Sequence, residues 1–323
     1  MKAYQWSSSA TGLQLVDIPS PTPKPNEVLI HIEASGLCHT DVHIINGHVN
    51  DWIRKQPITL GHEVSGTIIE LSPSSPSNFK IGDRVAVALP GHSTEEPDWG
   101  NAVGMGFDGG YAEQMVVNER CLVRIPENVT FEQAAVAGDS ILTAYHAVKI
   151  EAEAGPDKTI GIVGLGGVGL NGVRAAALLG AKVYGFDIDD SKFDSATAQG
   201  AKKCFQTLIE AEGVRFDVIV DFAGVGTTTA QAVERVKAGG RVVLVGMGSP
   251  TMELSTLAVV TRRIQLRGSL GASLSEFEEV LDLIGRGDIV PMLEEIPFAD
   301  VCEGLKRVEQ SEVRGRLFTR PNK

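Results

Sequence analysis

The sequence predicts an α/β protein of two domains, a small irregular β-barrel and a doubly wound parallel sheet. Residues 27–120 are rich in short apolar strands, whereas strands and helices alternate from about residue 146. A glycine-rich pattern follows the first strand of the second region. A chain of 323 residues is also long for a single hydrophobic core.

The first region contains β segments that Gly, Pro and Ser residues interrupt. Residues 28–32, 64–69 and 83–87 are short runs rich in Val, Ile or Ala. Runs of this kind, separated by turn residues, are typical of strands. We expect them to form a small barrel, with the Ser- and Pro-rich stretch 72–77 as a solvent loop.

The second region alternates between apolar strands and helical patterns. Such alternation favours parallel strands joined by crossover helices. After Gly287 the chain turns through Pro291 and Pro297 into a last segment that ends with Arg316-Leu317-Phe318. The expected strands are residues 159–163, 181–186, 217–221, 241–245 and 264–267, and the expected helices are residues 173–179, 228–237 and 274–284.

The glycines of the second region match a dinucleotide-binding fingerprint. Gly164, Gly166 and Gly169 form a G-x-G-x-x-G pattern that also contains Gly167 and Val168. A strand precedes the pattern and a helix follows it, so a pyrophosphate could lie on free N–H groups at the helix N-terminus. The alternative is a tight turn in another kind of α/β protein.

Asp187 is the expected partner of the cofactor ribose. It follows the second strand of this region, about 20 residues beyond the glycines. A carboxylate there binds the ribose hydroxyls of NAD and repels the 2′-phosphate of NADP, so we expect NAD.

The first region holds a candidate metal site. Cys38 and His62 offer a thiolate and an imidazole, which a borderline-soft ion such as Zn²⁺ prefers. Asp41 and Glu63 lie beside them in the sequence and could orient these ligands. Taken singly, a Cys or His is more often a buried structural residue.

Thr40 and His43 could move a proton away from a substrate. Their hydroxyl and imidazole groups follow Cys38 closely in the sequence. A positioned hydroxyl and imidazole are what removal of a proton from an alcohol requires.

Composition excludes several classes of function. The net charge of −12 argues against a general basic surface for nucleic acid or anionic membranes. No apolar run is long enough to span a membrane, and residues 1–6 lack the apolar core of a secretory signal. The four cysteines lie far apart without a C-x-x-C pair, which favours reduced thiols. We expect a cytoplasmic enzyme.

The chain resembles the medium-chain dehydrogenase/reductase superfamily, and within it the zinc-dependent alcohol dehydrogenases. The matching segments, in order, are residues 36–41, 61–63, 82–85 and 109–113 and the cofactor glycines. The resemblance implies a chaperonin-10-like catalytic domain, residues 1–145 and 288–323, with a Rossmann domain at 146–287. It also implies a homodimer or homotetramer.

The resemblance further implies roles for individual residues. Cys38 and His62 would hold a catalytic zinc, with Glu63 as an alternative or transient ligand. Thr40 would bind the substrate oxygen and His43 would relay its proton to solvent. Further cofactor contacts are implied for His39 and Arg316 at the pyrophosphate, Lys192 at the adenosine ribose, Thr143 at the nicotinamide, and Val245.

This chain departs from the family pattern at two places. Asp139 occupies the position of a common third zinc ligand, a Cys, and we expect its carboxylate to replace the thiolate. The alternative is that Asp139 caps a helix that starts nearby. The span 89–108 lacks the four cysteines of a structural zinc lobe, and its acidic stretch 91–99 reads as a solvated loop. We therefore expect one zinc per chain.

The implied activity is interconversion of an alcohol and an aldehyde or ketone by hydride transfer with NAD(H). Zinc would act as a Lewis acid on the substrate oxygen. Three alternatives share the fold: a zinc-independent enone or quinone reductase, an iminium reductase, and a non-catalytic crystallin-like protein. The substrate and the physiological direction stay open.

Overall fold

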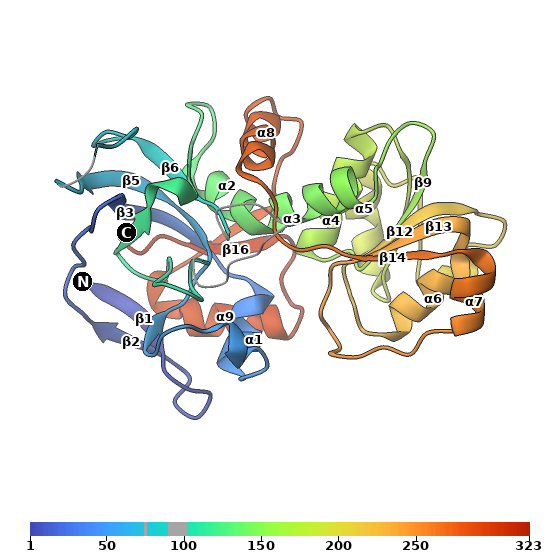
Figure 1. Ribbon diagram of the computed structural model, residues 1–323, viewed down its shortest axis with the longest axis horizontal. Coiled ribbons are helices and arrows are strands. Elements are labelled where there is room, and N and C mark those ends of the chain that lie inside the picture. Colours follow the sequence, from blue (N-terminus) through green and yellow to red (C-terminus); the bar gives the residue numbers. More distant parts are fainter. Residues whose placement is uncertain (74–75, 90–101) are drawn as a thin grey trace. The chain divides into compact units, whose positions relative to one another are not determined.

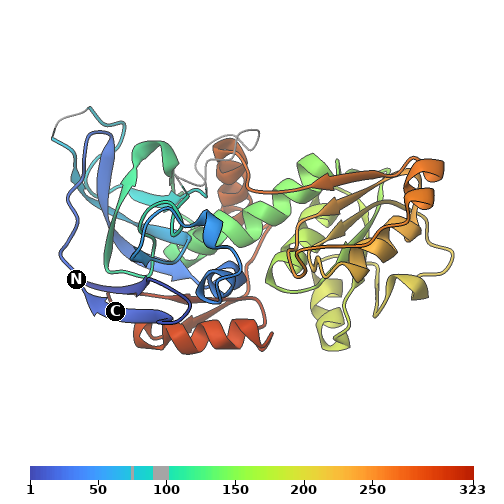
Figure 2. The ribbon, with the colours of Figure 1, turned by 60° about the horizontal axis from the view of Figure 1, so that its bottom comes forward.

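The computed structural model describes residues 1–73, 76–89 and 102–323. The chain divides into two compact units (Figure 1). Unit 1 comprises Met1–Leu142 and Gly271–Lys323, and unit 2 comprises Thr143–Leu270. Both termini belong to unit 1, where they lie near each other (Figures 1 and 2).

The units differ from the expected domains mainly at the second boundary. The expected Rossmann domain ran to residue 287, whereas unit 2 ends at Leu270. The helix α8 (Leu274–Gly285) therefore belongs to unit 1. A side chain at Gly138 would meet the ring of Phe277 at 3.4 Å, which shows that α8 packs on the segment around Gly138.

Unit 1 is built on a seven-stranded, mainly antiparallel sheet. The strand order is β15-β16-β3-β5-β6-β8, and β7 also pairs with β3. The predicted strands in residues 28–32, 64–69 and 83–87 are confirmed as β3, β5 and β6. The bounds are β3 Glu27–Gly36, β5 Glu63–Leu71, β6 Arg84–Val87, β7 Gln114–Asn118, β8 Leu122–Arg124, β15 Leu293–Ile296 and β16 Arg316–Thr319.

A smaller antiparallel sheet completes the strands described in unit 1. Its order is β2 (Leu13–Asp17), β1 (Lys2–Trp6) and β4 (Ile58–Thr59). Two apolar clusters form the core, one around Ile30 and one around Trp6. The other helices of this unit are α1 His39–Ile45, α2 Phe131–Val136 and α9 Val301–Glu309.

Unit 2 is a six-stranded sheet in which all neighbouring strands are parallel. The order β11-β10-β9-β12-β13-β14 is the 3-2-1-4-5-6 arrangement of a Rossmann fold, which confirms the predicted doubly wound sheet. The strands are β9 Thr159–Val163, β10 Lys182–Phe186, β11 Lys203–Phe205, β12 Phe216–Asp221, β13 Val236–Leu244 and β14 Gln265–Gly268.

Two helices of unit 2 differ in extent from the sequence expectation. The helix expected at 173–179 is α4, Gly167–Leu178, which begins inside the glycine motif. The helix expected at 228–237 is α6, Thr227–Arg235, because Val236 already pairs with Phe216 in the sheet. The other helices of this unit are α3 Leu142–His146, whose first residue belongs to unit 1, α5 Phe193–Ala198 and α7 Thr256–Arg262.

Parts of two predicted loops lie outside the described residues. These are residues 74–75 of the Ser- and Pro-rich stretch and residues 90–101, which include the acidic stretch 91–99. Among the described residues, no helix is both long enough and apolar enough to cross a membrane.

Candidate functional site

Three metal-ligand side chains from separate segments of unit 1 meet in one place. Cys38 is the N-cap residue of α1, directly after β3, and His62 immediately precedes β5. Asp139 lies in a π-helical turn, Ala137–Ile141, that continues α2. One ligand atom from each residue lies within 4.8 Å of the other two, and no other such group of three occurs among the residues that the structure describes.

The geometry of this triad leaves buried polar atoms without hydrogen bonds. The Cys38 thiol lies 3.3 Å from Oδ2 of Asp139, and Nε2 of His62 lies 3.6 Å from the same oxygen. His62 is buried, yet neither of its ring nitrogens has an aligned hydrogen bond. Because an unsatisfied buried polar group is costly, a cation at Nε2 would remove that cost. A thiolate, an imidazole and a carboxylate fit zinc.

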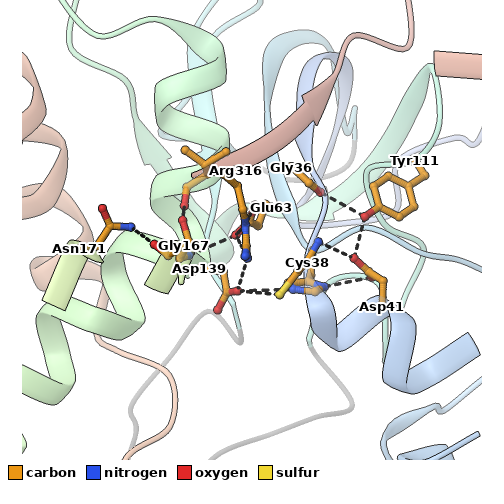
Figure 3. A network of polar contacts seen from close by, with 12 residues as sticks. Gly36, Cys38, Asp41, Glu63, Tyr111, Asp139, Gly167, Asn171 and Arg316 are labelled. Carbon is orange, nitrogen blue, oxygen red and sulfur yellow. Dashed lines mark hydrogen bonds and ion pairs between the residues drawn. The ribbon is translucent and has the colours of Figure 1, made fainter. Parts of the chain in front are cut away.

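Asp41 fixes the other side of the His62 ring. Its Oδ1 lies 3.3 Å from Nδ1 of His62, although the two atoms are not aligned as a hydrogen bond. Its Oδ2 accepts the Tyr111 hydroxyl at 2.6 Å and the backbone N–H of Cys38 at 3.3 Å (Figure 3). A carboxylate behind a ligating histidine orients the ring toward the metal.

Arg316 joins Glu63 to Asp139. Its Nε lies 3.0 Å from both carboxylate oxygens of Glu63, and its Nη2 lies 2.5 Å from Oε1 of Glu63 and 3.1 Å from Oδ2 of Asp139 (Figure 3). Gly36 makes room for this pair, because a Cβ there would lie 1.9 Å from Oε2 of Glu63. The buried Glu63 carboxylate faces Arg316, and it is not a member of the three-residue ligand group.

The acidic groups around His62 favour a positive charge at the triad. Burial opposes protonation of His62, but Asp41 and Cys38 outweigh it and raise its pKa well above the usual value. Burial also raises the pKa of Glu63, and the ion pair with Arg316 offsets part of that increase. For Asp139, burial is outweighed by His62 and Arg316, which hold its pKa well below the usual range.

The capping alternative for Asp139 is wrong. Thr130 is the N-cap of α2, where its hydroxyl accepts the Gln133 N–H and the Gln133 side chain accepts the Thr130 N–H. Asp139 lies further along the same helical run, so its carboxylate is not needed at the helix start.

The proposed proton-transfer residues lie on α1. Thr40 is on its first turn and His43 on its second, with His43 half-buried. Burial lowers the pKa of His43, and the nearby His39 and His48 lower it further. His43 is therefore neutral at neutral pH and can accept a proton.

The glycine motif of unit 2 forms an open cradle at the N-terminus of α4. Gly164 has φ +85°, and a Cβ on Gly169 would lie 1.7 Å from the carbonyl oxygen of Gly164. Gly166 is the N-cap residue, and a Cβ there would meet no atom within 4 Å. Gly167 and Val168 begin the helix. The first N–H groups of a helix have no partner within it, and the space beside Gly166 is open, as binding of a pyrophosphate requires.

Asp187 lies directly after β10, as predicted. Its carboxylate accepts the backbone N–H of Leu165 at 2.7 Å and that of Asp189 at 3.0 Å. Lys192 lies 3.1 Å from both carboxylate oxygens. Asp187 thus ties the glycine loop to the end of the next strand.

Asp221 organises the neighbouring strand end. Val245, an expected cofactor contact, directly follows β13 and donates its N–H to the carbonyl oxygen of Asp221 at 3.0 Å. The other expected contacts are placed as follows: Thr143 on α3, and His39 exposed at the start of α1.

Several contributors were not assigned from the sequence. Tyr111 lies inside the segment 109–113 that carried the resemblance, but nothing there indicated its bond to Asp41. The pairing of Arg316 with Glu63 and Asp139 joins residues far apart in the chain, and no local pattern predicts it. His48 is the third histidine within ten residues, after His39 and His43, and this clustering is the signal for it in the sequence.

Two family models match this chain. Residues 24–127 match the alcohol dehydrogenase GroES-like domain, and residues 167–286 match the zinc-binding dehydrogenase domain. The first lies within unit 1, and most of the second lies within unit 2.

Relatives and solved structures agree with these matches. An alcohol dehydrogenase of Geobacillus stearothermophilus is 29% identical over 98% of both chains. The NADP-dependent alcohol dehydrogenase 6 of Saccharomyces cerevisiae is 31% identical over 91% of this chain and 89% of its own.

Among solved structures, acetophenone reductase from Geotrichum candidum in complex with NAD has a TM-score of 0.89 at 30% identity, covering 99% of this chain and 96% of its own. The alcohol dehydrogenase of Aeropyrum pernix has a TM-score of 0.88 at 26% identity, covering 99% of this chain and 100% of its own. With the ligand triad and the dinucleotide cradle, these likenesses show that the chain belongs to the zinc-type alcohol dehydrogenases of the medium-chain dehydrogenase/reductase superfamily.

Proposed function

We propose that this protein is an NAD-dependent dehydrogenase that interconverts an alcohol and an aldehyde or ketone, with one catalytic zinc. The observation that carries the proposal is the buried triad of Cys38, His62 and Asp139, in which the His62 ring lacks hydrogen bonds. These residues would hold the zinc, which supplies Lewis-acid polarisation of the substrate oxygen when bound.

Residues around the triad hold its members in place. Asp41 orients the His62 ring, while Tyr111 and the Cys38 N–H hold the Asp41 carboxylate. Arg316 balances the charge of Glu63 and contacts Asp139. A role for Glu63 as an alternative ligand would require its carboxylate to leave Arg316.

Thr40 and His43 would handle the proton. The Thr40 hydroxyl would accept the proton of the substrate hydroxyl as it passes its own proton on, and the neutral His43 ring would deliver that proton to solvent. The lowered pKa of His43 keeps the ring in the accepting form at neutral pH.

Unit 2 would bind the dinucleotide, which accepts or gives the hydride. The glycine cradle would take the pyrophosphate on backbone N–H groups, and Asp187 with Lys192 would take the adenosine ribose. The charge of Asp187 favours NAD, whereas the name of the yeast relative specifies NADP. We also propose that the cofactor contacts four further residues. These are His39 and Arg316 at the pyrophosphate, Thr143 at the nicotinamide, and Val245.

A substrate screen tests the function. Primary and secondary alcohols, aldehydes and ketones would be assayed with NAD(H) and NADP(H), with zinc measured in the same preparation. We expect turnover with NAD(H) that a chelator abolishes and added zinc restores. Reduction of enones, quinones or imines without zinc would contradict the proposal in favour of the zinc-independent alternatives, and no turnover would favour a non-catalytic protein.

We further propose a homodimer or homotetramer joined through unit 2. The strand β14 ends the strand order of the described sheet, and Leu266 on it is exposed. On α7, Leu257 is 73% exposed and Val260 is 69% exposed. Analytical ultracentrifugation of the wild type and of Leu257→Glu tests this.

The free cysteines fit a reducing compartment, and we propose the cytoplasm.

A further inference from the structure

Three histidines gather on and beside α1, outside the metal triad. His39 and His43 are four residues apart and share one face of the helix, with ring centroids 4.7 Å apart. His48 follows the helix, and its ring centroid lies 5.6 Å from that of His43. His39 and His48 are exposed, and His43 is half-buried.

The turn after α1 brings His48 back to His43. Gly47 has φ +78°, a conformation that favours glycine, and the N–H of His48 donates to the carbonyl oxygen of His43 at 2.9 Å. Asn46 anchors the turn through a hydrogen bond of 2.9 Å to Glu309 on α9. As a result, the Nδ1 atoms of His43 and His48 lie 3.4 Å apart.

This separation suits a shared metal ion as well as a hydrogen bond. Two nitrogen ligands about 2.0–2.1 Å from one ion lie about 3.4 Å apart at a tetrahedral angle and about 2.9 Å apart at the right angle that Ni²⁺ prefers. A small rotation of the exposed His48 ring covers this difference. A hydrogen bond requires a proton on one Nδ1 atom, whereas a metal ion requires both to be unprotonated, which neutral rings achieve by moving that proton to Nε2. The pKa of His43, lowered by burial and by its two histidine neighbours, keeps this ring neutral and therefore able to bind a metal.

We propose that His43 and His48 form a second, exchangeable site for a divalent transition-metal ion, whose occupancy inhibits the enzyme. Water would fill the remaining positions, because His48 is exposed. With the metal on Nδ1, the proton of the neutral His43 ring lies on Nε2, so the ring has no lone pair left to accept a proton. The inhibition rests on the proposed function, but the metal binding does not.

Calorimetry tests the binding. Ni²⁺ would be titrated into zinc-loaded protein that had been desalted, so that the triad is filled. We expect one Ni²⁺ site per chain in the wild type, and in His48→Gln a loss of affinity on the order of tenfold or more, which is about 1.4 kcal/mol or more. His31→Gln, a histidine on β3 outside the cluster, is the matched control and should bind Ni²⁺ as the wild type does. Equal affinity in wild type and His48→Gln, or no Ni²⁺ binding, would overturn the site.

Steady-state kinetics tests the consequence. For each protein, the rate of alcohol oxidation at increasing Ni²⁺ is compared with its own rate without Ni²⁺. We expect inhibition of the wild type and of His31→Gln over the concentration range in which calorimetry detects binding, and little inhibition of His48→Gln. Binding without inhibition would refute the inhibitory role. An inactive wild type would instead refute the proposed function, and the calorimetric result would still decide the metal site.

Discussion

Buried carboxylates in the two units are satisfied in different ways. In unit 2, Asp221 is fully buried and accepts four hydrogen bonds: from the N–H groups of Ala223 and Gly224 and from the hydroxyls of Thr228 and Thr229. In unit 1, Oδ1 of the buried Asp41 and both ring nitrogens of His62 have no hydrogen bond.

This difference separates a structural carboxylate from a candidate ligand site. The donors around Asp221 come from its own turn and the helix that follows, so the carboxylate shapes that turn without any bound group. The acceptors around His62 come from distant segments. Other donors reach the Asp41 and Asp139 carboxylates, but Oδ1 of Asp41 and both ring nitrogens of His62 have no hydrogen bond. A cation would complete the arrangement around His62, whereas the arrangement around Asp221 requires none. The predictions below test this distinction.

The largest effect is expected from loss of the third ligand. Asp139→Ala should lose zinc and nearly all activity, because two ligands hold a catalytic zinc weakly. Asp139→Cys restores a thiolate and should retain metal. Elemental analysis of protein purified without added metal, before and after dialysis against a chelator, measures this. Unchanged zinc content in Asp139→Ala, or full activity of the wild type without zinc, would show that the triad is not the site.

Removing the hydrogen-bonded Asp221 carboxylate should lower the stability of the protein and leave its zinc content unchanged. Asp221→Ala leaves two hydroxyls and two N–H groups without their acceptor, and we expect a loss of roughly 3 kcal/mol in the free energy of unfolding. Zinc content should not change, because Asp221 belongs to unit 2. Denaturant unfolding and elemental analysis of the same sample check both statements. Loss of zinc with unchanged stability would contradict the structural role assigned to Asp221.

Thr40→Ala removes the hydroxyl expected to hold the substrate oxygen. We expect kcat for alcohol oxidation to fall by roughly 10²-fold or more, the usual contribution of a positioned proton-transfer group. Thr40→Ser keeps a hydroxyl and is the matched control, with activity near that of the wild type. Equal losses in both variants would point to a packing role for the threonine methyl group.

Asp187 should set the cofactor preference. The wild type should have a higher kcat/KM for NAD than for NADP, and Asp187→Ser should narrow the gap by about tenfold, because a phosphate dianion is no longer repelled. Asp187→Ala should also narrow the gap, with an added loss for both cofactors because Leu165 loses its acceptor. A wild type that prefers NADP would refute this assignment.

Local sequence patterns predicted most of the fold and the chemical types at the site. The Rossmann sheet was predictable because each of its strands and helices has its own short-range hydrophobic pattern. The glycine motif showed where the first strand turns into its helix. Cys38 and His62 were identified by residue type. Their bond network was not predictable, because Tyr111 and Arg316 reach it from other strands and segments through long-range packing. The compact unit around the Rossmann sheet ends at Leu270, before the predicted domain end at 287. Nothing in the sequence pattern of α8 indicates which core receives its apolar face.

The smallest effect is expected at His43, and it should depend on pH. Its pKa is lowered by burial and by His39 and His48, so the ring stays neutral, and able to accept a proton, to a lower pH than a free imidazole. Bases in the solvent become scarcer as the pH falls from 8 to 6, so proton transfer through His43 matters most at the lower pH. His43→Ala should therefore lose activity mainly below neutral pH, by less than about tenfold, since buffer replaces part of the relay.

Profiles of kcat against pH at low and high concentrations of imidazole buffer measure the effect, and a high buffer concentration should restore the rate. A loss that is equal at every pH and insensitive to buffer would assign His43 a structural role, and negligible effects at both Thr40 and His43 would remove this pair from the reaction.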